Sequence, residues 1–156
     1  MAIPSNEPSA PIVYNSTFRH GVDEKRRVQI PAMWRPAQAD VELTLIFWPQ
    51  HKAGPCLRVL PPKEMAELMA DLDRMENSNP NKTVMKRFIG SESVQVTLDK
   101  VGRICVPEDK ARAAGISDEV VLVGLLDRFE IWNPERYATV KTADAVLAQQ
   151  AFAMME

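Results

Sequence analysis

The stretch Asp23-Glu-Lys-Arg-Arg27-Val-Gln-Ile-Pro31 has a counterpart 76 residues later in the same chain, Asp99-Lys-Val-Gly-Arg103-Ile-Cys-Val-Pro107. Both copies read Asp, three residues, Arg, an apolar residue, any residue, an apolar residue and Pro. Asp, Arg and Pro each make up about 5% of an average protein, so these offsets arise by chance at roughly one starting position in ten thousand. Two occurrences in 156 residues therefore indicate an internal duplication.

The segments that follow the two motifs also correspond. In each copy an apolar run, a turn and a second apolar run lead to a proline that begins a helical stretch. The paired segments are 41–48 and 120–126, 56–60 and 129–132, and 62–76 and 134–154. Each half has only about 40–50 residues outside its last helix, and a core that small is marginal alone. The two halves are therefore predicted to pack on each other.

Local patterns predict the remaining elements. Strands are expected at 17–22, 28–30 and 94–98, and helices at 31–38, 62–76, about 79–89, 107–114 and 134–154. Asn133 and either Ser78 or Asn79 are predicted helix caps, because their side chains can accept hydrogen bonds from a first helical turn. The last helix would gather on one face Tyr137, Val140, Leu147, Ala151 and Met154, with Asp144 interrupting the stripe. Residues 1–12 are expected to form a flexible tail.

The composition is that of a globular protein, with 46% hydrophobic and 26% charged residues. The longest apolar run, near 120–126, is far shorter than the roughly 20 residues of a membrane helix. Residues 1–11 lack the features of a secretory signal, and two cysteines are too few for a disulfide framework. The chain is therefore predicted to be cytoplasmic. Cys56 and Cys105 are predicted to be packing residues, and Trp34, Trp48 and Trp132 to belong to the core or a subunit interface.

The sequence contains no catalytic or cofactor motif. The two histidines, His20 and His51, have no Cys, His or Glu at metal-ligand spacing. It has neither a glycine-rich phosphate loop nor a nucleophile elbow. We therefore expect no enzyme activity, no metal and no cofactor.

Positive charge is clustered although the whole chain is slightly acidic, with a net charge of −2 and a pI of about 5.8. Nucleic-acid-binding domains often have a pI above about 9, so binding to DNA would need a local basic surface. The basic clusters are Arg19, Lys25, Arg26 and Arg27, then Lys82, Lys86 and Arg87, and finally Lys100 and Arg103. Two of the three overlap the repeated motif.

The motif itself predicts a braced turn. An Asp that opens a turn can accept hydrogen bonds from backbone N–H groups two or three residues on, and Gly102 can adopt a left-handed conformation at little cost. Arg103 would then lie within reach of Asp99. One interpretation is a surface pair that contributes little to stability. The other is an arginine held rigidly as a donor for phosphate or for guanine O6 and N7.

Together these motifs resemble the MraZ family, which is built from two AbrB-type (SpoVT/AbrB) repeats. The resemblance is carried by the two Asp-x-x-x-Arg motifs, by Phe18-Arg-His-Gly-Val-Asp23 and by the segment 119–136, and it covers roughly residues 13–140. It implies an α+β, mainly β fold. In that fold two tandem swapped-hairpin β-barrel repeats pack as an intrachain pseudo-dimer with peripheral helices. The implied segments are a tail (1–12), a first repeat (13–61), connecting helices (62–90), a second repeat (91–134) and a C-terminal helix (135–156).

The resemblance also implies a function. Members of the family are repressors that bind double-stranded DNA at direct repeats upstream of the division and cell-wall genes, including their own operon. They assemble into ring-like homo-oligomers and act in the cytoplasm at the nucleoid, without a membrane. Carried over to this chain, the DNA-binding residues are Arg19, Lys25, Arg26, Arg27, Lys100 and Arg103, and the residues that brace the turns are Asp23, Asp99 and Gly102.

Two features leave alternatives open. The first motif has Arg26 where the family has the glycine seen at Gly102, so either its turn differs or it accepts about 1 kcal/mol of left-handed strain. A duplicated scaffold of this fold could also serve only to oligomerise or to bind a protein, with the basic turns incidental. An antitoxin-like DNA binder is less consistent with two full repeats and a helical C-terminus.

Overall fold

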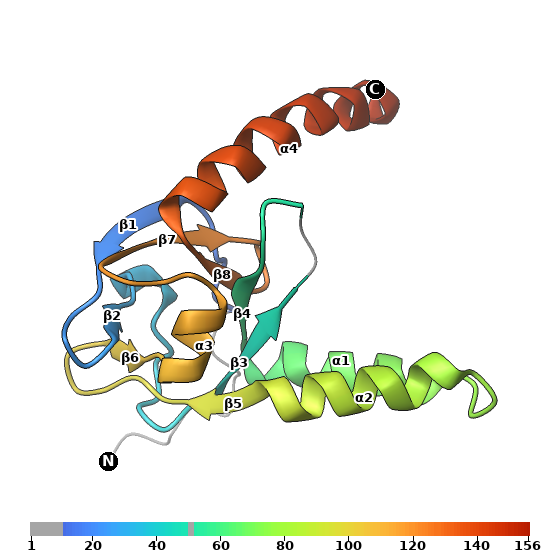
Figure 1. Ribbon diagram of the computed structural model, residues 1–156, viewed down its shortest axis with the longest axis horizontal. Helices are drawn as coiled ribbons and strands as arrows, with labels where there is room; N and C mark the ends of the chain where they lie inside the picture. Colours follow the sequence, from blue (N-terminus) through green and yellow to red (C-terminus); the bar gives the residue numbers. More distant parts are fainter. Residues whose placement is uncertain (1–10, 50–51) are drawn as a thin grey trace, which may run out of the picture.

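The computed structural model describes residues 11–49 and 52–156, and it shows a mixed fold with an antiparallel sheet, a short ribbon and four α-helices (Figure 1). Its strands are β1 (Thr17–Gly21), β2 (Arg27–Gln29), β3 (Leu43–Trp48), β4 (Cys56–Leu60), β5 (Ser93–Val96), β6 (Arg103–Cys105), β7 (Glu119–Gly124) and β8 (Phe129–Trp132). Its helices are the short 3-10 helix η1 (Ala32–Trp34), α1 (Pro62–Arg74), α2 (Pro80–Glu92), α3 (Glu108–Ala113) and α4 (Pro134–Met155). The predicted α+β class is confirmed.

The strands of the two halves interleave. The six-stranded sheet has the order β1-β7-β8-β4-β3-β5, and β2 pairs with β6 in a separate two-stranded ribbon. If β1 is matched with β5, β3 with β7 and β4 with β8, this order reads the same from either end. The registers of the two edge strands also correspond. His20 of β1 lies opposite Val120 of β7, and Val96 of β5, which is 76 residues after His20, lies opposite Leu43 of β3. Each half therefore completes its sheet with strands of the other, as the small size of each half predicted.

The sheet is open, with β1 and β5 as its two edges among the described residues. The closed barrel implied by the resemblance is therefore replaced by an open sheet covered by the β2–β6 ribbon. Val22 and Val28 lie on either side of the turn that joins β1 to β2, and they pair in an isolated antiparallel bridge.

The main core lies between the ribbon and the sheet. Val28 and Ile104 enter it from the ribbon, and both are completely buried. Trp34 is at its centre, with its ring centroid 5.1 Å from that of Phe129 and 5.2 Å from that of Phe18. Burying each such side chain stabilises the fold by about 1.5–3 kcal/mol. The prediction that Trp34 is a core residue is confirmed.

A second core cluster lies on the opposite face of β3 and β4. There α1 and α2, which run side by side as a helical hairpin, cover Ile46 and Leu60 with Leu72 and Ile89 (Figure 1). A third cluster joins Cys56, Trp132 and Val140. Cys56 is buried in this cluster, which confirms it as a packing residue, and this burial raises the pKa of its thiol.

The predicted caps are confirmed at two helices. Asn79 accepts a hydrogen bond from the backbone N–H of Asn81 at 2.9 Å, and Asn133 accepts one from that of Arg136 at 3.1 Å. The helix predicted over 31–38 is wrong, because only Ala32–Trp34 is helical. Proline disfavours helical conformation in the residue before it, and Arg35, which precedes Pro36, is extended (φ −82°, ψ 131°).

Three further expectations need revision. The apolar stripe of the last helix contacts the protein only near its start, at Tyr137 and Val140, while the more distal Leu147 is exposed. Cys105 is exposed instead of packed. Most of the predicted tail, residues 1–10, lies outside the described residues, but Ile12 packs against the main core, so the tail cannot extend to residue 12.

Candidate nucleic-acid interface

The two repeated motifs meet in the β2–β6 ribbon. Arg27 lies opposite Cys105, Val28 opposite Ile104, and Gln29 opposite Arg103. Because side chains alternate across a strand, Val28 and Ile104 point into the core and the other four share the outer face. The ribbon therefore presents one arginine from each copy of the motif on a single face.

The first turn is braced by Asp23. Its Oδ1 accepts hydrogen bonds from the backbone N–H groups of Lys25 (2.9 Å) and Arg27 (2.8 Å). Its Oδ2 accepts one from Arg27 Nε at 2.6 Å. The backbone N–H of Arg27 is the main cause that lowers the pKa of the Asp23 carboxyl, with the Arg27 guanidinium adding to it. Asp23 therefore stays ionised and fixes the orientation of Arg27.

The second turn repeats this geometry. Asp99 Oδ1 accepts from the backbone N–H groups of Val101 (3.0 Å) and Arg103 (2.9 Å), and Asp99 Oδ2 accepts from Arg103 Nε at 2.9 Å. The same causes lower the pKa of the Asp99 carboxyl. Arg103 Nη1 also lies 3.9 Å from Asp23 Oδ2. Arg27 and Arg103, which are 76 positions apart in the chain, thus both have guanidinium groups near the Asp23 carboxylate.

One difference between the motifs, Arg26 against Gly102, has a structural explanation. Both residues are left-handed, with φ of 59° and 82°. At the second turn, Arg35 lies over Gly102 and donates its Nε–H to the carbonyl of Ile30 at 2.9 Å. At the first turn, Arg26 donates its own Nε–H to the carbonyl of Val106 at 3.1 Å. Val106 is the counterpart of Ile30, so an arginine donates to the equivalent carbonyl at each turn. The arginine comes from within the first turn (Arg26) but from outside the second (Arg35).

The remaining predicted DNA contacts differ in placement. Lys25 and Lys100 are exposed within the turns. Arg19 is instead on β1, where its guanidinium pairs with Glu119 of β7, and no contact of the described residues joins it to the turns. The part of the cluster that the structure brings together is therefore the two turns without Arg19.

Two ribbon residues were missed as candidates, Gln29 and Cys105. Gln29 donates its Nε2–H to the carbonyl of Val101 at 2.7 Å, and Cys105 Sγ donates to that of Lys25 at 3.3 Å. These bonds tie each turn to the neighbouring strand. The alternation around Val28 and Ile104 was the signal that could have found both residues, because it places them on the arginine face.

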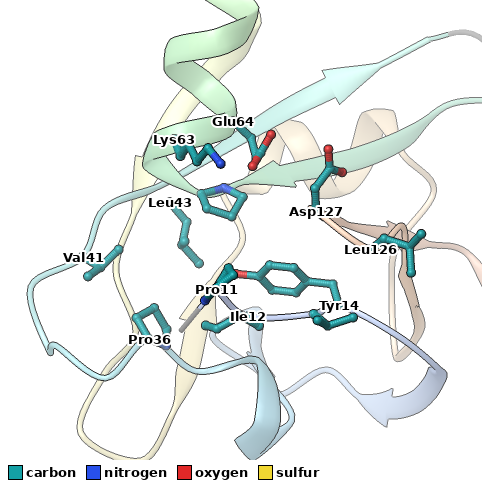
Figure 2. Close-up of a pocket in the computed structure, with 12 residues that line it drawn as sticks. Pro11, Ile12, Tyr14, Pro36, Val41, Leu43, Lys63, Glu64, Leu126 and Asp127 are labelled. Carbon is teal, nitrogen blue, oxygen red and sulfur yellow. The ribbon is translucent and has the colours of Figure 1, made fainter. Parts of the chain in front are cut away.

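A cavity of about 640 Å³ lies elsewhere on the molecule (Figure 2). Its walls are mainly apolar, with Tyr14 inside and the carboxyl groups of Glu64 and Asp127 at its rim. Burial raises the pKa of Tyr14 to about 12. No residue of the two motifs lines this cavity, so it is separate from the ribbon.

Within the described part of the chain, no group of three or more His, Cys, Asp or Glu side chains could hold a metal ion. No helix in the described ranges is both long and apolar enough to span a bilayer.

A two-stranded ribbon with arginines on its outer face is a surface that can enter a groove of duplex DNA, and the fold thus defines a candidate nucleic-acid-binding protein of the β-ribbon class. Comparison with known proteins gives the family. Residues 89–154 match the family model described as "MraZ protein, putative antitoxin-like".

Full-length relatives extend this match. The chain is 30% identical to the transcriptional regulator MraZ of Clostridium tetani over 139 residues, covering 89% of this chain and 94% of the relative. It is 30% identical to the protein of the same name from Parvibaculum lavamentivorans (88% and 83% covered) and 27% identical to that of Caulobacter vibrioides (92% and 91%). The chain belongs to the MraZ family. These relatives support a role in transcription regulation.

Proposed function

We propose that this protein is a sequence-specific repressor that binds double-stranded DNA at direct repeats upstream of a division and cell-wall gene cluster, including its own operon. The observation that supports this most is the pair Arg27 and Arg103, fixed by Asp23 and Asp99 on the outer face of one ribbon. An arginine held in one orientation loses less conformational freedom on binding phosphate or guanine. Lys25 and Lys100 would add phosphate contacts beside them.

We further propose that the chain consists of two AbrB-like swapped-hairpin repeats, 13–61 and 91–134, joined by the helices of 62–90 and followed by the helix of 135–156. The strand order that reads the same in both directions supports this division. So does the hydrogen bonding of the two turns, which agrees atom by atom.

The weak overall charge is compatible with DNA binding if several copies act together. Each turn carries a net charge of only +1, while α1 carries four acidic residues. A ring-like homo-oligomer would place many such turns on one surface, and simultaneous contact with repeated boxes multiplies weak affinities. The protein would then reside in the cytoplasm at the nucleoid.

Binding to DNA from upstream of its own gene, compared with scrambled DNA, tests this function. We expect preferential binding that needs more than one repeated box and weakens steeply with salt. The double substitution Arg27→Ala and Arg103→Ala should leave assembly intact, abolish the preference and reduce the salt slope by about 1 per lost phosphate contact. Arg112→Ala is the matched control, because Arg112 is exposed and paired with Glu108 at 3.0 Å outside the ribbon.

The alternative function is an oligomeric protein-interaction scaffold with the same fold and no specific DNA site. The observation in its favour is that the Nε–H of Arg27 and of Arg103 is already used by an Asp of the same turn. Equal affinity for upstream and scrambled DNA at every salt concentration would refute the repressor and favour the scaffold.

A further inference from the structure

The distal part of α4 is an exposed helix without charge. From Ala145 to Met155 it contains no Asp, Glu, Lys or Arg. Val146, Leu147 and Phe152 are 58%, 62% and 66% exposed, and this part of the helix extends away from the sheet (Figure 1). Most of the stability of a helix in a protein comes from the packing of its apolar face, and clustered exposed apolar side chains mark an interaction surface.

The internal symmetry of the chain indicates what covers such a helix. α1 and α4 are counterparts, because each begins with a proline directly after β4 or β8. The apolar side of α1 is covered by α2, where Leu72 packs with Ile89. α4 has no equivalent of α2 within the described ranges. A helix from a second copy of the chain would cover α4 in the way that α2 covers α1.

A groove beside α2 offers a matching surface. A groove of about 310 Å³ between the end of β3 and α2 is lined by Trp48, Pro49, Val84, Met85, Phe88 and Ile89. None of these side chains is charged. The exposed Arg87 lies between the groove residues Met85 and Phe88 on α2, whereas Asp144 and Glu156 flank the uncharged part of α4. The two surfaces are thus both apolar, and the charged residues beside them have opposite signs.

We propose that the end of α4 of one copy, through Leu147, Ala151 and Met154, packs in the α2 groove of a second copy. In that arrangement α2 contacts both α1 of its own chain and α4 of its neighbour, two helices that are equivalent by the internal symmetry. The contact joins different surfaces of the two copies, so repeating it generates a closed ring or an open filament. This inference rests on the proposed ring and names its interface.

Two pairs of substitutions on α4 test the interface. At 100° per residue, Leu147 and Met154 lie within about 40° of Val140 around the helix, and Val146 and Ala153 lie on the opposite side. We expect L147E/M154E to give the monomer mass of 17.5 kDa in light scattering, with unchanged helix content by circular dichroism. The control V146E/A153E adds the same charge to the same helix and should assemble as the unaltered protein does.

Mixing distinguishes this contact from a symmetric pairing of two α4 helices. V84E/M85E, in the groove, should also be monomeric. When it is mixed with L147E/M154E, one intact groove meets one intact α4 end, so a 1:1 heterodimer of twice the monomer mass is expected.

The outcomes separate the two proposals. If the unaltered protein forms an oligomer and L147E/M154E assembles equally well, or if V84E/M85E alone still dimerises, the interface is refuted and the ring stands. If the unaltered protein is a monomer at micromolar concentration, the ring itself is refuted.

Discussion

Substituting Gly102 by alanine should destabilise the protein through a specific neighbour, Arg35. A methyl group on the backbone at position 102 would overlap the Nε and Cζ atoms of Arg35. The left-handed conformation, φ 82°, costs a non-glycine residue about 1–2 kcal/mol. Displacing Arg35 sacrifices its hydrogen bond to the carbonyl of Ile30, and hydrogen bonds to charged groups contribute about 1.5–3 kcal/mol. We therefore expect Gly102→Ala to lower the free energy of unfolding by about 3 kcal/mol.

A double-mutant cycle isolates the contribution of Arg35. In an Arg35→Ala background the overlap is absent, so Gly102→Ala should cost only the backbone strain of about 1–2 kcal/mol. Urea denaturation followed by tryptophan fluorescence at fixed protein concentration measures these energies. Arg26→Ala is the matched control, because it removes the equivalent hydrogen bond at a position that is already a left-handed non-glycine residue. Equal costs of Gly102→Ala in both backgrounds would refute the reasoning.

Three further predictions concern stability and reactivity. The folded state lowers the pKa of Asp23 and Asp99, so their stabilisation is present above about pH 4 and is lost as pH falls below it; changing both to Asn should flatten the acid side of a plot of melting temperature against pH. Asn133→Ala removes the cap of α4 and a hydrogen bond to Gly115, and should cost about 1–2 kcal/mol in urea denaturation. In the native protein a thiol reagent should modify Cys105 quickly and Cys56 only after unfolding; equal reactivity would contradict the burial of Cys56.

The sequence predicted most local features because they depend on neighbouring residues. The caps at Asn79 and Asn133 and the turn hydrogen bonds of Asp99 each involve groups at most four residues apart. The helix expected over 31–38 was wrong although the relevant signal was local, because Pro36 disfavours helical conformation in Arg35 and the segment ends after one turn. The apolar stripe of α4 was visible in the sequence, but periodicity does not reveal whether a face meets its own chain or another one.

The sequence alone shows that the Asp-x-x-x-Arg motif occurs twice and predicts in each copy a turn that opens with Asp and ends with Arg, because turn chemistry depends on residues at fixed spacing. The folded chain was needed to show that Arg27 and Arg103 share one ribbon face, that Arg35 fills at Gly102 the role that Arg26 fills at its own turn, and that Cys105 faces outward. Those contacts join residues up to 80 positions apart. Strand register fixes such pairs, and register follows from how the two halves bury their apolar faces against each other.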